Sequence, residues 1–150
     1  MRIVLQRVSK ASITIKNQIK SKINAGLLIL IGIENTDTHE DILWLCGKII
    51  KLRIFEDENE VMNWSIKDID GDIIVVSQFT LHASTKKGNR PSYLKAAKPD
   101  VAIPLYEQFI TQLEKEFQKP VQTGEFGADM KVELINDGPI TISMDSKNRA

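Results

Sequence analysis

The ten residues from position 72 read Asp72-Ile73-Ile74-Val75-Val76-Ser77-Gln78-Phe79-Thr80-Leu81. Four β-branched apolar residues follow an Asp-Gly turn, which predicts a buried strand. Ser77, Gln78 and Thr80 then bring two hydroxyls and an amide to the end of that strand. Buried polar side chains need hydrogen-bonding partners, so this strand end indicates either a binding site or a strand that emerges into solvent.

Further strands are expected on both sides of this segment. Residues 10–16 alternate between apolar and polar side chains, as in a strand with one buried face. Residues 27–33 are nearly all apolar, so we expect that strand to be covered on both faces. The remaining expected strands are 2–8, 19–23, 61–66, 131–135 and 140–144, the last two separated by a tight turn at Asn136-Asp137-Gly138-Pro139.

Two amphipathic helices complete the pattern. The first is expected to open at Asp37-Thr38-His39-Glu40, which has the spacing of an N-cap followed three residues later by glutamate. Its apolar stripe includes Cys46, which we interpret as a small core residue. The second helix starts at Pro99-Asp100 and ends before Pro120, with an apolar ridge at Val101, Leu105, Phe109, Leu113 and Phe117.

Composition restricts the class of protein. The chain has 150 residues, of which 42% are hydrophobic and 27% are charged, as expected for one globular domain spanning residues 1–150. No apolar run is long enough to cross a bilayer, no signal-peptide pattern is present, and a single cysteine suits a reducing cytoplasm. Two histidines and one cysteine cannot form a zinc site, and no tight carboxylate cluster suggests magnesium, so we expect no metal and no cofactor.

A local excess of positive charge follows the polar strand end. Formal net charge is zero, so any nucleic-acid contact must come from such a patch. Gly88 and Pro91 predict a loop there, and the segment from 82 to 98 has no acidic residue but five cations: Lys86, Lys87, Arg90, Lys95 and Lys98. We expect Lys86, Lys87 and Arg90 to contact an RNA phosphate backbone; the alternative is a solvated basic loop.

Several motifs together resemble one family, the D-aminoacyl-tRNA deacylases. They are Met1-Arg2-Ile3-Val4-Leu5-Gln6-Arg7-Val8, Ser77-Gln78-Phe79-Thr80-Leu81, Lys87-Gly88-Asn89-Arg90-Pro91, Thr123-Gly124-x-Phe126-Gly127 and Asn136-Asp137-Gly138-Pro139-Ile140-Thr141. Their order and spacing match along the whole chain. The resemblance implies an α+β fold: a mainly antiparallel, barrel-like β structure with two amphipathic helices.

The resemblance also implies an activity and an assembly. The enzyme would hydrolyse the ester between a D-amino acid and the terminal ribose of tRNA. It would be a homodimer, in which a cis Gly138–Pro139 peptide reaches from one subunit into the pocket of the other. Without the resemblance, Gly138-Pro139 would be interpreted as an ordinary hairpin turn.

These motifs suggest how the substrate's hand is recognised. The carbonyls of Gly138 and Pro139, with Asn136 in the same motif, are expected to bind the amino group and backbone of the substrate and to leave no room for an L side chain. Selection by a clash predicts weak side-chain specificity, and it predicts that glycyl-tRNA is also cleaved. Phe126 and Met130 are either pocket walls or core residues, and Arg7 either braces the Gly-Pro turn or forms a structural ion pair.

The catalytic group is left open among three routes. On a regular strand Gln78 and Thr80 share one face, and Ser77 and Phe79 share the other. The backbone N–H groups of Phe79 and Thr80 would then be oxyanion donors, or Thr80 would be a nucleophile, although it lacks an adjacent base. We favour a substrate-assisted route, in which the free ribose hydroxyl helps to activate water.

Two other classes of function compete with an ester hydrolase. One is a module that binds the aminoacyl end of tRNA without cleaving it. The other is a dimeric β protein whose Gly-Pro turn is only an interface element. The basic loop favours the first two classes over the third, and the polar strand end favours hydrolysis over binding alone.

Overall fold

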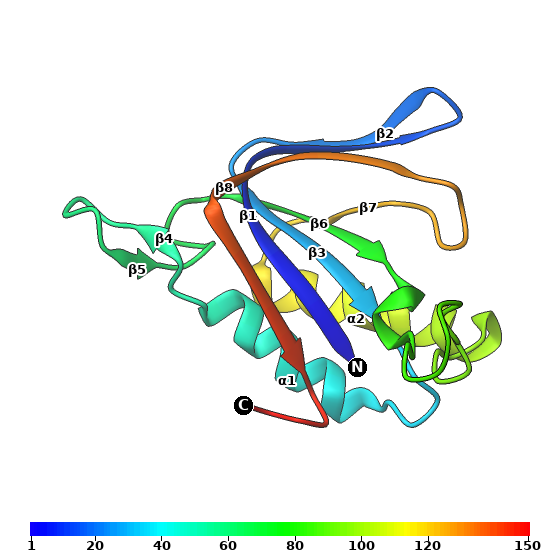
Figure 1. Ribbon diagram of the computed structural model, residues 1–150. Coiled ribbons are helices and arrows are strands. Elements are labelled where there is room, and N and C mark those ends of the chain that lie inside the picture. Colours follow the sequence, from blue (N-terminus) through cyan, green and yellow to red (C-terminus); the bar gives the residue numbers. More distant parts are fainter.

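The computed structural model describes residues 1–150 and shows a bent sheet with two helices on one side (Figure 1). In chain order the elements are β1 (Arg2–Ile15), β2 (Gln18–Ile23), β3 (Gly26–Gly32), α1 (His39–Lys51), β4 (Phe55–Glu56), β5 (Met62–Trp64), β6 (Asp72–Ser77), the 3-10 helix η1 (Phe79–His82), α2 (Pro99–Phe117), β7 (Gln122–Thr123) and β8 (Lys131–Asp145). This agrees with the expected α+β class. Neither helix is both long and apolar enough to span a membrane.

The long strand β1 organises the sheet. One of its edges pairs with β3 along the first half and with β2 along the second, and β8 pairs along the other edge. These pairings are antiparallel, but β6 pairs in parallel with both β3 and β7. Each parallel pair needs a crossover connection; α1 lies in the first crossover and α2 in the second. A helix-covered parallel pair explains why residues 27–33 are almost uniformly apolar.

Apolar side chains form two cores, one on each face of the sheet. The larger core packs α1 and α2 against Ile3, Leu5 and the alternate residues of β3 and β6. The smaller core lies where the second half of β1, β2 and the start of β8 fold over the opposite face, and it includes Ile13, Ile74 and Val76. The sheet therefore closes partly on itself, which is the barrel-like form expected.

Local details differ from the sequence expectations. Helix α1 takes Thr38 as its N-cap and Asp41 as the partner in the capping box, one residue later than the expected Asp37 and Glu40. Asp37 instead accepts from the backbone N–H of Glu34 at 2.8 Å, so a loop contact competes for this side chain. In α2 the buried stripe includes Ala102 and Tyr106, whereas Val101 is exposed.

Candidate active site

A cavity of about 310 Å³ opens at the carboxyl end of β6. Ser77, Gln78 and Phe79 line one side, and the loop between β7 and β8 lines the other. The structure thus brings together five of the expected site residues: Ser77, Gln78, Phe79, Phe126 and Met130. Ten of the fourteen lining residues are hydrophobic, so the cavity suits an apolar group held at a polar edge.

Small residues keep this cavity open. Ala97 precedes α2 and Ala102 lies in its first turns; both line the cavity, as do Gly127 and Ala128 from the opposite loop. The helical pattern places Ala102 on the apolar ridge of the second helix, but sequence patterns gave no reason to assign Ala97 or Ala102 to a site, because small apolar residues near a helix start are common in cores. The glycine-punctuated segment around Gly127 was the only local signal for this wall.

The strand end differs from the regular strand that the sequence predicts. β6 stops at Ser77, the N–H of Gln78 donates to the Ile31 carbonyl at 2.7 Å, and the chain then turns into η1. The expectation that Gln78 and Thr80 share a strand face is therefore wrong, because the 3-10 turn is closed by the N–H of Leu81 donating to the Gln78 carbonyl at 3.2 Å. Thr80 does not line the cavity, and its hydroxyl accepts from the Gln78 amide.

The start of η1 presents backbone donors beside the cavity. Phe79 and Thr80 are its first two residues, so their N–H groups have no partner inside this helix. The Phe79 ring is 54% exposed and packs edge-to-face on Tyr93, with ring centroids 5.0 Å apart. Backbone donors and an exposed aromatic ring are thus next to each other at the cavity mouth.

His82 is not positioned as a base for Thr80. It is 1% exposed, and its Nδ1 lies 3.3 Å from Oε2 of Glu34. Both residues belong to the short helix η1, so they do not lie two positions apart on one face of an extended strand. Glu34 follows β3, so this contact ties η1 to the neighbouring strand rather than to the cavity.

The aromatic wall is anchored to the sheet. The Phe126 ring lies 5.9 Å from that of Tyr106 in α2, in an edge-to-face arrangement, and the Tyr106 hydroxyl donates to the Val75 carbonyl of β6 at 3.1 Å. Burial raises the pKa of Tyr106 to about 12. Phe126 packs against the larger core and Met130 against the smaller, and both also line the cavity, so each serves as core and wall.

The Gly-Pro motif is an excursion within one strand. Asn136 pairs with Val8 of β1, and the next paired residue of β8, Thr141, pairs with Gln6. Residues 137–140 of β8 therefore lie opposite the single residue Arg7, and we call these four residues the excursion. The alternative interpretation, an ordinary hairpin turn that pairs the two flanking strands with each other, is therefore wrong: both halves of β8 pair with β1. Asn136 closes the excursion, since its Oδ1 accepts from the N–H of Ile140 at 3.1 Å and its Nδ2 donates to Thr141 Oγ1 at 3.0 Å.

Arg7 holds this excursion from beneath. The Gly138–Pro139 peptide bond is cis, as the resemblance implies. The buried Arg7 donates through Nε to the Asp137 carbonyl at 3.1 Å and through Nη1 to the Ile54 carbonyl at 2.8 Å. Gly138 has φ +130°, and a Cβ there would lie 3.2 Å from Arg7 Nη2, so glycine suits this position. Gly138 and Pro139 themselves are exposed.

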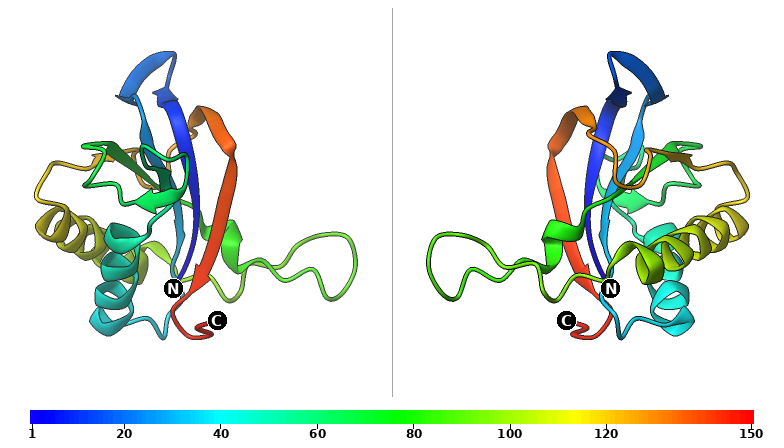
Figure 2. Two further views of the ribbon diagram at one scale, coloured as in Figure 1. Left: turned by 90° about the vertical axis from the view of Figure 1, so that its left-hand side faces the viewer. Right: turned by 90° about the vertical axis from the view of Figure 1, so that its right-hand side faces the viewer.

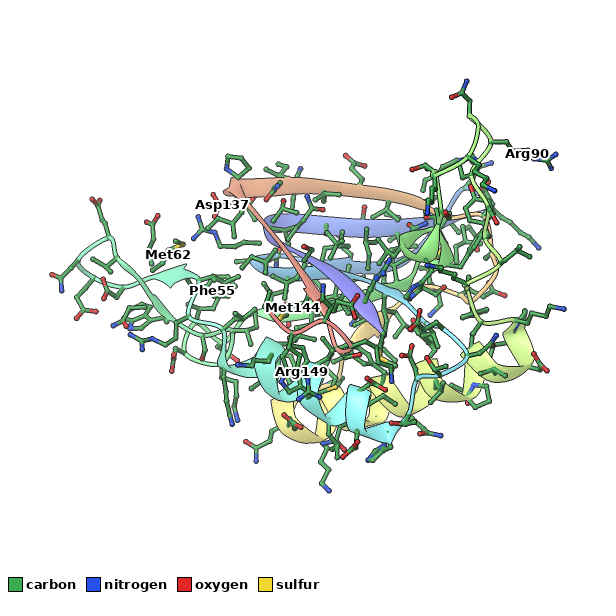
Figure 3. All side chains as sticks on the ribbon, turned by 60° about the horizontal axis from the view of Figure 1, so that its bottom comes forward. Phe55, Met62, Arg90, Asp137, Met144 and Arg149 are labelled. Carbon is green, nitrogen blue, oxygen red and sulfur yellow. The ribbon has the colours of Figure 1, made fainter.

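The excursion lies far from the cavity of its own chain. Arg7 pairs with Leu27, which pairs with Ile73 at the start of β6, whereas Ser77 lies four residues further along. This separates the two features by about 13 Å along the strands and about 14 Å across three strand spacings. Figure 3 shows Asp137 and Arg90, which lies in the loop after η1, at opposite ends of the molecule. One chain therefore does not bring Gly138-Pro139 and the cavity together.

The basic loop projects from the sheet face opposite the helices (Figure 2). Ser84 and Ser92 close its base through two backbone hydrogen bonds of 2.8 and 2.9 Å. Lys86, Lys87 and Arg90 are exposed beyond that base, and none of them forms an ion pair. The loop follows η1 directly, so these three cations lie on the cavity side of the molecule.

Comparison with known proteins identifies the class of enzyme first. Proteins called D-aminoacyl-tRNA deacylase match almost the whole chain: one from Flavobacterium johnsoniae is 71% identical and one from Bacteroides fragilis is 66% identical, each over 99% of both chains. The chain is thus a hydrolase of the aminoacyl-tRNA deacylase class. The model of the D-Tyr-tRNA(Tyr) deacylase family matches residues 4–145, and the chain belongs to that family. The resemblance seen in the motifs is confirmed.

Solved structures agree on the fold. One described as c-Myc DNA Unwinding Element Binding Protein is 38% identical, with a TM-score of 0.92 over 97% of this chain and 98% of that one. Another, described as a probable eukaryotic D-amino acid tRNA deacylase, is 18% identical, with a TM-score of 0.81 over 95% of this chain and 97% of that one. The second likeness concerns the fold alone.

Proposed function

We propose that this chain acts in the cytoplasm as a chiral proofreading enzyme, which hydrolyses the ester of D-aminoacyl-tRNA and mischarged glycyl-tRNA and rejects L-aminoacyl-tRNA. The observation that supports this proposal is the distance, within one chain, between the cavity and the Gly138-Pro139 excursion. The cavity has one polar wall, and the exposed cis Gly138-Pro139 excursion lies at the other end of the chain. A site containing both needs two copies, so the active form is a homodimer in which each Gly138-Pro139 enters its partner's cavity.

We attribute exclusion of the L side chain to the rigidity of the excursion that would enter the cavity. The excursion is held by one hydrogen bond from Arg7 to the Asp137 carbonyl, Arg7 is itself anchored to the Ile54 carbonyl, and Asn136 closes the excursion, so it cannot easily withdraw to admit a larger group. Its carbonyls would bind the α-ammonium group, which carries three donors. A D side chain would point away from the excursion, and glycine has no side chain to clash, so both would be accepted.

Hydrolysis is assigned to positioned backbone donors together with the substrate's own hydroxyl. The N–H groups of Phe79 and Thr80 are available as oxyanion donors at the cavity mouth. The Thr80 hydroxyl contacts the Gln78 amide, which cannot accept a proton as a base, and His82 is held by Glu34. These contacts argue against a Thr80 nucleophile and favour activation of water by the free ribose hydroxyl.

The tRNA would reach the cavity across the basic loop. Lys86, Lys87 and Arg90 are exposed cations on the loop that follows η1, so the cavity and the loop would be reached by one tRNA whose phosphates upstream of the terminal ribose contact these cations. A nucleic-acid-binding module without hydrolysis is the second candidate, since the loop alone would serve it equally well. The apolar cavity beside the loop favours the enzyme, because a phosphate-binding surface needs no such cavity.

A subunit-mixing experiment tests the two-copy site. Ala128→Trp should block the cavity, and Gly138→Ala should displace the excursion, because the added Cβ would lie 3.0 Å from Ile140 Cγ1 at a positive φ. Strain of about 1–3 kcal/mol at Gly138 predicts a loss of kcat/KM of about five- to 150-fold in the Gly138→Ala homodimer. The Ala128→Trp homodimer should lose activity because its cavity is filled.

The mixed dimer distinguishes the two arrangements. It contains one site built from an intact cavity and an intact partner excursion, so D-tyrosyl-tRNA deacylation should recover toward half of the wild-type rate per dimer. Two wild-type preparations, differently tagged and mixed in the same way, provide the control. No recovery in a mixed dimer confirmed by affinity tags would show that each subunit uses its own Gly138-Pro139.

A further inference from the structure

A second basic surface lies on α1, away from the loop already described. A groove along the last turns of this helix is lined by Leu43, Trp44, Gly47, Lys48, Lys51, Leu52 and Arg53, none of them acidic. We call it the α1 groove. Trp44 is one of its lining residues, and Lys48 Nζ lies 5.8 Å and the Arg149 guanidinium 4.6 Å from the centroid of the Trp44 ring. Glu116 is the acidic group beside Gly47, at 3.8 Å from where a Cβ would be.

Part of this charge has a structural use, but part of it does not. Arg53 donates to the Asn63 carbonyl at 3.1 Å and so braces β5, and cations in the last turn of a helix also favour its dipole. Lys48 and Lys51 form no ion pair. Two lysines without an acidic partner, next to Arg53 and the Trp44 ring, can bind the phosphates of a nucleic-acid backbone.

The position of the α1 groove connects it to the Gly-Pro excursion. Arg7 donates to the carbonyls of both Asp137 and Ile54, and Ile54 directly follows Arg53 in the wall of the groove. Figure 1 shows the carboxyl end of α1 at the same end of the molecule as the bend of β8, away from the end of β6. The groove and the excursion are thus two sides of one rigid unit.

We propose that the α1 groove binds the acceptor-stem phosphates of the tRNA whose 3′ end occupies the partner subunit's cavity. This rests on the proposed function, because the excursion of one subunit must enter the cavity of the other. Because Arg7 links the groove to the excursion, entry of the excursion into the partner's cavity would bring the groove toward that cavity. One tRNA contacts both subunits, which makes the dimer the unit of tRNA recognition as well as of catalysis.

Charge reversal with a matched control tests this proposal. Lys48→Glu with Lys51→Glu should lower kcat/KM for D-tyrosyl-tRNA by about tenfold or more at low salt and make its dependence on salt shallower by about one to two in the log–log slope. Lys20→Glu with Lys22→Glu makes the same change of net charge on the exposed strand β2 and should have a much smaller effect. Equal losses in the two double variants would overturn the proposal, since net charge alone would explain them.

A short substrate separates this proposal from the proposed function. D-tyrosyl-adenosine has the reacting ester but no acceptor stem, so the loss in the α1 variant should be confined to tRNA. If the variant loses both substrates equally, the lysines support folding rather than tRNA binding. If the wild type cleaves neither substrate, the proposed function fails, which is a different result from the failure of the groove.

Mixed dimers then show which subunit supplies the groove. In the first mixed dimer, one subunit is wild type and the other carries Ala128→Trp together with Lys48→Glu and Lys51→Glu. The only open cavity, in the wild-type subunit, then faces the altered groove of its partner, and tRNA cleavage should fall. In the second mixed dimer, one subunit carries Ala128→Trp and the other carries the two α1 substitutions. The open cavity of the second subunit then faces the intact groove of the first, and cleavage should be retained. The opposite pattern would place the groove in the same subunit as the cavity it serves.

Discussion

Replacing Arg7 by methionine tests how the Gly-Pro excursion is held. Methionine retains an apolar stem of similar length but leaves the carbonyls of Asp137 and Ile54 without their donor. The Arg7 side chain is 7% exposed, so water does not easily replace those bonds, whereas the 57% exposed Asp137 carboxylate at 3.6 Å adds little. Two hydrogen bonds from a charged donor, less the relief of a buried charge, amount to about 2–4 kcal/mol of unfolding free energy.

The assay measures both stability and selectivity. For a chain of this length the loss corresponds to a Tm lower by roughly 10 °C. Because the excursion loses its brace, the ratio of D-tyrosyl- to L-tyrosyl-tRNA cleavage should also fall. Arg2→Met is the matched control on the same strand: Arg2 contacts Asp145 and the Leu81 carbonyl, but its side chain is 43% exposed, so its loss should cost under about 1 kcal/mol. If Arg7→Met resembled Arg2→Met in both readouts, the brace would be refuted.

Three further outcomes follow from the structure. Thr80→Ala should keep kcat within about tenfold of wild type, because backbone N–H groups remain in place; a loss of several orders of magnitude in single-turnover deacylation would restore the nucleophile. Reversing Lys86, Lys87 and Arg90 to glutamate should weaken tRNA binding and flatten its salt dependence, and unchanged filter-binding curves would remove the basic loop from the interface. For Asp41, burial raises the pKa, but hydrogen bonds from Ser146 and Lys147 outweigh it and hold the pKa below the ordinary 3.8. The resulting stability begins to fall once the pH drops to about the ordinary value and is lost only as the pH falls through the much lower pKa of the folded state, so Asp41→Asn should destabilise the chain most at pH 7 and by a somewhat smaller amount at pH 3 in denaturant titrations.

Period and turn signals were sufficient for the two helices and for most of the long strands of the fold. The β-branched run ending at Ser77 is a strand, and Pro99 and Pro120 bracket α2 as expected. The start of α1 was displaced by one residue, because Asp37 and Thr38 are both good caps and a loop contact of Asp37 decides between them. The parallel pairing of β6 with β3 could not be derived locally, since pairing depends on where the crossover helices pack.

The site shows the same limit more clearly. The polar residues at the end of β6 could be identified from the sequence because they interrupt an apolar strand. Their backbone conformation could not be predicted, because the 3-10 helix η1 begins where residue propensities favour a continued strand. Residue patterns alone would have indicated a hairpin turn at Gly138-Pro139, because Asn-Asp-Gly-Pro is a strong local turn signal. Only the pairing of both halves of β8 with β1 reveals otherwise. Ala97 and Ala102 contribute to the site because their small side chains leave the cavity open, and a residue pattern does not predict such a space.

Chiral selection is tested by measuring deacylation of matched D-tyrosyl-, L-tyrosyl- and glycyl-tRNA by the purified protein, with a chelator present. We expect the enzyme to cleave the D-tyrosyl and glycyl esters and to leave the L-tyrosyl ester intact. Cleavage of L-tyrosyl-tRNA as readily as of D-tyrosyl-tRNA would show that Gly138-Pro139 does not select the hand of the substrate. Binding of tRNA without cleavage of any ester would contradict the proposed hydrolysis itself.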